Sequence, residues 1–133
     1  MFDVDFGDEF TLEYSNFPKE LQDAIQDFID LFLLHGLGEH TKPFYKGKLS
    51  YSWRNLENSD PDYIYTKSNN LWHYHIGIPT YIASNYGSYY TSDMVLHFVW
   101  KKGENSILIV DCTDHYKSDG SFWLPSPKYL VRT

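Results

Sequence analysis

The spacing of apolar residues changes from helical to strand-like after Gly36, and this change constrains the fold more than any other feature of the sequence. Between Pro18 and Gly36 apolar residues recur every three or four positions, which predicts an amphipathic helix that ends at Gly36. Farther along, the alternation of histidines with apolar residues at 71–76 and the mainly apolar runs at 94–100 and 106–112 predict strands. One helix followed by a strand meander predicts an α+β fold, with the N-terminal helix packed on an antiparallel β-sheet.

Weaker signals predict shorter elements around this framework. Residues 1–14 also alternate, which is typical of an exposed edge strand or a hairpin. Residues 102–105 predict a hairpin turn, and residues 78–90, which contain Pro79, Asn85 and Gly87, predict a loop that could lie over a site. Further short strands are expected at 48–53, 63–66 and 129–132.

The length and the single cysteine limit the class of protein. A chain of 133 residues with 42% hydrophobic residues is expected to form one domain over residues 1–133, divided into an acidic strand or arm at 1–15 and a core at 16–133. Cys112 has no partner for an internal disulfide, so we expect a buried, inert thiol and a cytoplasmic location. No segment approaches the roughly 20 apolar residues that span a bilayer, so no membrane association is expected.

Charge is unevenly distributed along the sequence. The net charge is −7, and the first forty residues hold ten acidic residues against one basic residue, Lys19. The remainder holds ten basic and eight acidic residues. Two interpretations remain open: the carboxylates form a solvated helix face, or they form an acidic flank that restrains or orients a mildly basic face for a polyanion.

The histidines are the most informative candidates for chemistry. His73 and His75 are two positions apart on a predicted strand, so both leave the same face, opposite a mainly apolar one. We therefore expect their imidazoles to line an open or partly wet surface of the sheet. His97 lies between two valines, which favours a hydrogen-bonded core histidine over a catalyst, and His115 directly follows the third strand.

If the strands pair as a meander, several imidazoles, a lysine and carboxylates could gather in one patch. Imidazole titrates near neutral pH and can pass a proton in either direction, so the patch suits general acid and base catalysis. Structural roles, RNA contact and metal ligation also remain open for His73 and His75. Two histidines at i and i+2 with a third His or Asp can hold a divalent ion, although no HExxH, paired CxxC or EF-hand motif is present.

Several segments together resemble a known family. They are the helix at 18–36, the strand LWHYHIG at 71–77, the YTSD element at 90–93 that leads into VLHFVW, and the strand ILIVDCTDHYK that ends in His115 and Lys117. Over residues 11–120 the chain resembles the YafO branch of the RelE superfamily, which are small toxins of bacterial toxin–antitoxin pairs. The resemblance implies a RelE-like α+β fold, cleavage of mRNA on the ribosome without a metal or other cofactor, and neutralisation by a cognate antitoxin protein.

The resemblance also assigns candidate site residues. His73 and His75 match a His-x-His in the corresponding strand, Thr91 and Asp93 match a Thr-x-Asp before the next strand, and His115 matches a His after the last long strand.

The implied chemistry is attack of the RNA 2′-hydroxyl on the adjacent phosphate, which gives a 2′,3′-cyclic phosphate. Our hypothesis gives the role of base to His73 or His75 and that of acid to His115. Further expected contacts are phosphate stabilisation by Lys117 with Arg54, and base stacking by Trp72, Trp123 or Tyr116.

Two other classes of function are consistent with the sequence. The first is a non-catalytic interaction module, such as an immunity or inhibitor protein that presents its acidic N-terminal face to a basic partner. The second is a metal-dependent hydrolase that uses the histidines as ligands.

Overall fold

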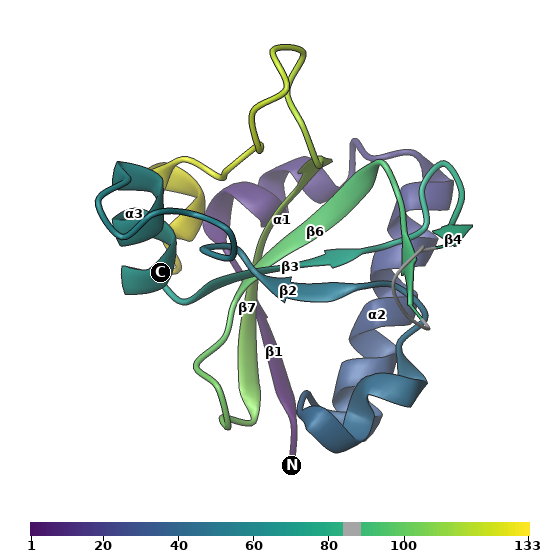
Figure 1. The fold of residues 1–133 in the computed structure, drawn as a ribbon. Coiled ribbons are helices and arrows are strands. Elements are labelled where there is room, and N and C mark those ends of the chain that lie inside the picture. Colours follow the sequence, from purple (N-terminus) through teal and green to yellow (C-terminus); the bar gives the residue numbers. More distant parts are fainter. Residues whose placement is uncertain (84–88) are drawn as a thin grey trace.

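A computed structural model of the chain describes residues 1–83 and 89–133 (Figure 1). It confirms the α+β class. In chain order the elements are β1 (Asp3–Phe6), α1 (Asp8–Tyr14), α2 (Lys19–His35), the 3₁₀ helix η1 (Glu39–Phe44), β2 (Leu49–Tyr51), α3 (Pro61–Ser68), β3 (Leu71–His75), β4 (Ile82–Ala83), β5 (Tyr90–Thr91), β6 (Met94–Val99), β7 (Ser106–Asp114) and the 3₁₀ helix η2 (Pro127–Leu130). Of the loop predicted at 78–90, residues 84–88, including Asn85 and Gly87, lie outside the described residues.

The main sheet has the strand order β1-β7-β6-β3-β2. The strands β2, β3, β6 and β7 pair antiparallel, as the sequence predicted, and β4 pairs separately with β5. The prediction of a purely antiparallel sheet is wrong at β1, which runs parallel to β7 at the sheet edge. A parallel neighbour needs a long connection, and nearly the whole chain lies between these two strands.

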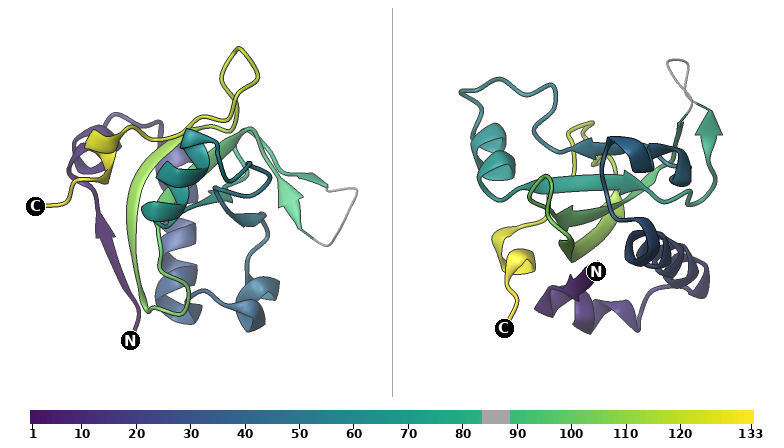
Figure 2. Two further views of the ribbon diagram at one scale, coloured as in Figure 1. Left: turned by 60° about the vertical axis from the view of Figure 1, so that its left-hand side comes forward. Right: turned by 90° about the horizontal axis from the view of Figure 1, so that it is seen from below.

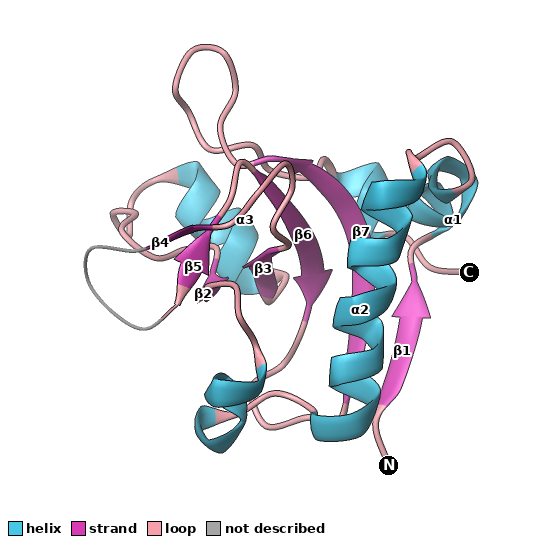
Figure 3. Cartoon of the chain, turned by 90° about the vertical axis from the view of Figure 1, so that its right-hand side faces the viewer, coloured by secondary structure: helices cyan, strands magenta, loops and turns pink. Residues whose placement is uncertain are grey.

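One face of the sheet is covered by α2, which lies across it in Figure 3. The ring of Phe28 in α2 lies with its centroid 4.8 Å from Tyr74 of β3 and 5.5 Å from Phe98 of β6. The buried side of α2 follows the predicted helical spacing, with Leu21, Ile25, Phe28, Ile29 and Phe32. The helix ends where predicted, at Gly36, whose φ of 67° suits glycine and whose backbone N–H donates to Phe32.

The opposite face of the sheet carries the histidines. It is covered by α3 and by the segment that follows β7, which projects from the end of that strand in Figure 2. The Tyr65 hydroxyl of α3 donates to the carbonyl of Pro125 at 2.7 Å, which joins the two covering segments. Phe122 then packs on this face, with its ring centroid 4.9 Å from that of His73.

The acidic N-terminal segment is part of the packed fold. The predicted alternation is correct at β1, where Phe2 and Val4 pack against the core. The prediction is wrong beyond Gly7, because residues 8–14 form a helix that buries Phe10 to 2% exposure. Acidic residues in the first turn of α1 stabilise its N-terminus, and this local preference outweighs the alternation.

Two of the predicted short strands are also wrong, whereas the strand predicted at 48–53 is present as β2. Residues 63–66 lie in α3, because Asp60 caps the helix by accepting from the Asp62 N–H at 2.8 Å and Pro61 occupies its first turn. Residues 129–132 fall in and after η2, which also begins with a proline. Among the described residues, no helix combines the length and apolar character needed to cross a membrane.

Candidate functional site

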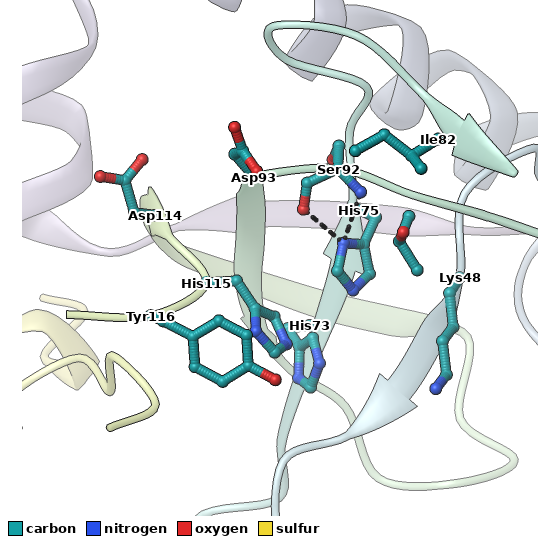
Figure 4. A pocket seen from close by; sticks show the side chains of 10 residues that line it. Lys48, His73, His75, Ile82, Ser92, Asp93, Asp114, His115 and Tyr116 are labelled. Atoms are coloured by element: carbon teal, nitrogen blue, oxygen red, sulfur yellow. Dashed lines mark hydrogen bonds between the residues drawn. The ribbon is translucent and has the colours of Figure 1, made fainter. Parts of the chain in front are cut away.

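A pocket of about 530 Å³ opens where the end of β3, the segment before β6 and the end of β7 meet (Figure 4). Histidines dominate its wall, with one lysine and two carboxylates at its border. The lining side chains are Lys48, His73, His75, Ile82, Thr91, Ser92, Asp93, Asp114, His115 and Tyr116.

Strand β3 positions two of the three imidazoles. His73 and His75 alternate with Tyr74, whose side chain packs into the core under α2, so both imidazoles leave the other face. This orientation was predicted, but the rings are less wet than expected: His73 is 7% and His75 is 5% exposed. They reach solvent at the pocket and are otherwise enclosed by protein.

Hydrogen bonds fix both of these rings through the same nitrogen. His73 Nδ1 lies 3.0 Å from Ser52 Oγ, and His75 Nδ1 lies 2.9 Å from the Ser92 carbonyl oxygen and 3.0 Å from the Ser92 backbone nitrogen. Nδ1 can donate to the carbonyl or accept from the N–H, but a single tautomer cannot do both. In either case Nε2 of each ring remains for other chemistry.

His115 reaches the same place from the end of β7. Its backbone N–H donates to the Asp93 carbonyl at 2.6 Å, which ties the end of β7 to the segment before β6. The ring centroid of His115 then lies 5.0 Å from that of His75 and 5.3 Å from that of His73. Phe122 closes the apolar side of this cluster, 4.8 Å from the His115 ring. We refer to His73, His75 and His115 as the histidine cluster.

The imidazoles of the cluster are held in the neutral form. Burial lowers the pKa of His115 to about 4, and repulsion from the charge of Lys48 and from the charge that His75 would carry if protonated acts in the same direction. Burial likewise lowers the pKa of His75, although its hydrogen bond to Ser92 opposes this effect. The pKa of His73 lies well below 6.5, because of burial and then because of the neighbouring histidines. At neutral pH the cluster therefore offers nitrogen lone pairs rather than positive charge.

His97 lies behind the cluster and does not line the pocket. It is fully buried, and its Nε2 lies 2.8 Å from Thr113 Oγ1. This confirms the interpretation of His97 as a hydrogen-bonded core histidine. Burial lowers its pKa to about 3, so it too is neutral.

The lysine at the pocket is not the one that the sequence suggested. Lys48 lines the wall, because its backbone carbonyl accepts from the His75 N–H and the antiparallel pairing sets both side chains on one face. Lys117 and Arg54 are exposed and lie outside the pocket lining. Sequence alternation could have identified Lys48 only if the register of β2 against β3 had been known.

The other residues that the sequence suggested for the site also fall into two groups, those that line the pocket and those that do not. Thr91, Asp93 and Tyr116 line the pocket, whereas Trp72 and Trp123 do not. The Tyr116 ring lies 4.2 Å from that of His115 and the residue is 59% exposed. Trp72 packs on the opposite side of β3, 4.8 Å from Trp100.

The carboxylates at the border do not pair with the imidazoles. Asp93 and Asp114 point away from the three rings in Figure 4. The cluster therefore lacks the His–carboxylate pair that would orient and charge an imidazole, and two of its rings, His73 and His75, are oriented by serines instead.

The donor set of the cluster also suits a metal ion. One possible ligand nitrogen from each ring lies within 4.8 Å of the other two, and in the part of the chain that the structure describes no other such group of His, Cys, Asp or Glu is found. The site therefore supports two kinds of chemistry: proton transfer by neutral imidazoles and coordination of an ion that prefers nitrogen.

Comparison of the chain with known protein families, with curated proteins and with solved structures finds no match. A functional conclusion therefore depends on the chemistry of this pocket.

Proposed function

We propose that the chain is the toxin of a bacterial toxin–antitoxin pair, an endoribonuclease that cleaves mRNA on the ribosome without a metal. The observation that supports this most is that three imidazoles and one ammonium group, from three separate parts of the chain, border one solvent-open pocket. Transesterification of RNA needs these groups: a base, an acid and a cation beside the phosphate. The resemblance to YafO-like toxins adds support from the sequence.

The base of this reaction is His75 or His73. Either ring is neutral at physiological pH, so its Nε2 can accept the proton of the RNA 2′-hydroxyl. The contacts of Nδ1 with Ser92 and Ser52 fix the direction in which each Nε2 points. A fixed ring favours the geometry needed for in-line attack on the neighbouring phosphorus.

The acid is His115, which gives a proton to the leaving 5′-oxygen. Its pKa is lowered to about 4 first by burial and then by neighbouring positive charge, both of which disfavour the imidazolium. A phosphodiester brings a negative charge into the same enclosed space, and this charge raises the pKa of a neighbouring imidazole. Substrate binding thus converts one member of the cluster into a proton donor, and Lys48 stabilises the charge that builds on the phosphate.

Aromatic and basic residues at the pocket provide contacts for the RNA on either side of the cut. Tyr116 exposes its ring beside His115 and can stack on a base. Lys46 lies over the rings of Tyr81 and Tyr90, 5.0 Å and 5.1 Å from their centroids, which places a cation close to the same opening. Lys117 and Arg54, being farther out, contact flanking phosphates in this proposal.

The proposal is tested by cleavage of a labelled mRNA with purified protein, alone and with ribosomes, in the presence of EDTA. We expect products that end in a 2′,3′-cyclic phosphate, and a 2′-deoxy substitution at the cut should prevent cleavage. His75→Ala and His115→Ala should each reduce the rate by at least about 100-fold, because each removes a proton-transfer group. Expression of either variant should also relieve inhibition of growth.

The matched control is His40→Ala, since His40 is exposed on η1 and does not line the pocket. Full toxicity of both cluster variants, or equal cleavage by all three variants, would exclude the proposed roles.

The proposal includes a cytoplasmic location and a cognate antitoxin that covers the pocket. Capture of proteins from cells that carry the native locus tests this part. Recovery of an antitoxin or of ribosomes together with the protein supports the toxin proposal. Recovery of a basic nuclease supports the alternative of an acidic inhibitor, whose binding needs no active site.

A further inference from the structure

We propose that His73, His75 and His115 also form a binding site for a divalent transition-metal ion of the zinc class, and that the bound ion inhibits the nuclease. One possible ligand nitrogen from each ring lies within 4.8 Å of the other two. In a tetrahedral site with metal–nitrogen bonds of about 2.05 Å, the ligand nitrogens lie about 3.3 Å apart. Each ring therefore has to move by roughly 1 Å or less to close on an ion.

Two of the three rings, His73 and His75, have the surroundings that metal-binding histidines commonly have. A coordinating imidazole commonly uses its second nitrogen to hydrogen-bond a carbonyl or another polar group, which fixes its tautomer. His75 Nδ1 has the Ser92 carbonyl oxygen at 2.9 Å, and His73 Nδ1 has Ser52 Oγ at 3.0 Å. Coordination through Nε2 selects the tautomer in which Nδ1 donates to these oxygens, which keeps the contact of His75 with the Ser92 carbonyl and gives up its contact with the Ser92 N–H.

The donor set indicates which ions the site accepts. Three imidazoles favour Zn²⁺, Co²⁺, Ni²⁺ or Cu²⁺ over Mg²⁺ and Ca²⁺, which prefer oxygen ligands. The rings are already neutral, so an ion does not have to displace a proton from them at neutral pH. Lys48 opposes the binding of a cation, whereas Asp93 and Asp114 at the border of the pocket reduce that repulsion.

The effect on activity rests on the proposed function. An ion coordinated to the cluster occupies the lone pairs that the cleavage reaction uses, so the same atoms cannot act as base and acid. Zinc is then an inhibitor, and a chelator restores cleavage. Binding of the ion itself does not depend on any nuclease activity, so the two proposals can be tested separately.

Binding is tested by titration of the metal-free, full-length protein with Co²⁺, followed by the visible d–d absorption of the ion, and then by displacement with Zn²⁺. We expect one ion per chain. His73→Ala, His75→Ala and His115→Ala should each weaken binding by at least about 10-fold, and His40→Ala should leave it unchanged. Circular dichroism of each variant checks that it is folded.

A second measurement on the unaltered protein avoids dependence on the variants. The chain has six histidines, and nitrogen NMR of the imidazoles should show that Zn²⁺ shifts the resonances of three of them. Absence of Co²⁺ absorption and of imidazole shifts, or equal binding by the cluster variants, overturns the metal site. If the protein binds metal but its metal-free form leaves RNA intact, the site is retained and the nuclease is excluded. Cleavage that zinc does not inhibit retains the nuclease and overturns inhibition through the cluster.

Discussion

The imidazoles of the cluster differ in how firmly single contacts hold them. His73 and His75 are each anchored through Nδ1 by a serine, whereas Nδ1 of His115 is buried without a hydrogen-bond partner among the described residues. Rotation of the His115 ring therefore breaks no hydrogen bond at this atom. A fixed base and a more adjustable acid suit a reaction in which the acid has to follow the leaving group.

At the same scale, Asp111 makes the stability of the protein depend on pH. It is 6% exposed, and burial raises its pKa from 3.8 to about 6, with a smaller contribution from the charge of Glu13. Between these pH values the unfolded chain loses the proton and the folded chain keeps it, so the free energy of unfolding falls as the pH rises. Above pH 6 Asp111 is ionised in both states, and the folded protein bears the full free-energy cost of burying the carboxylate.

We predict that Asp111→Asn stabilises the protein by on the order of 2 kcal/mol at pH 7 to 8. Asparagine has no charge to bury, and its Oδ1 can still accept from the Cys112 N–H as Asp111 does at 2.8 Å. Urea denaturation at several pH values measures the effect, which should fade as the pH drops from 6 and vanish about one unit below 3.8, where both states are protonated. Asp114→Asn, an exposed change on the same strand, is the control; equal effects of the two substitutions would contradict the assignment to burial.

At the scale of elements, the site depends on how closely the chain before β2 approaches β3. Gly47 forms a bridge with Tyr90, and its N–H donates to the Tyr74 hydroxyl at 3.0 Å. A Cβ at this position would lie 1.8 Å from the His75 carbonyl oxygen, a backbone atom that cannot rotate away. The same approach brings Lys48 beside His75, so this glycine positions the cation of the pocket.

Gly47→Ala should therefore destabilise the protein by about 3 kcal/mol and displace Lys48 from the histidine cluster. Thermal unfolding measures the first effect, and the salt dependence of RNA binding measures the second. Gly38→Ala is the control, because a Cβ there meets only the side chain of the exposed His40, at 3.2 Å. If the Gly47→Ala and Gly38→Ala variants have the same melting temperature, the close approach of these segments is not required for stability.

At the scale of the whole molecule, the acidic N-terminal third and the histidine cluster lie on different sides of the sheet. Helix α2 covers the face that carries Tyr74, while His73 and His75 leave the other face. The exposed acids of α2 therefore project away from the cluster, and the carboxylates that border the pocket are instead those of Asp93 and Asp114. In the proposed function, this arrangement leaves the acidic surface available for a protein partner while the pocket binds RNA.

The same arrangement makes the N-terminal strand structural rather than a detachable arm. Removal of residues 1–7 deletes β1, its four pairs with β7, and the packing of Phe2 on Phe32. We expect a loss on the order of 5 kcal/mol from these buried side chains and backbone pairs, which is comparable to the whole stability of a small domain.

Calorimetry of the truncated chain should show no cooperative unfolding transition, or one at a much lower temperature. Asp3→Asn is the matched change, because it removes an exposed charge and keeps the strand. A truncated chain that unfolds at the same temperature as the full chain would support the alternative of an independent acidic arm.

The sequence by itself determined the features that depend on local periodicity. The apolar spacing from Leu21 to Phe32 defined α2, and the alternation in β3 set His73 and His75 on one face, because the helical and extended backbones repeat every 3.6 and 2 residues. The burial of His97 and Cys112 also followed from their apolar neighbours.

Only the tertiary structure decided which distant residues meet. The parallel pairing of β1 with β7, the contact of Lys48 with the pocket and the approach of His115 to His73 all depend on strand order and register. Register is set by the packing of segments that lie tens of residues apart, so no local pattern encodes it. For this reason the histidines could be identified as candidates from their types and spacing, whereas their convergence, and the choice of Lys48 over Lys117 and Arg54, required the fold.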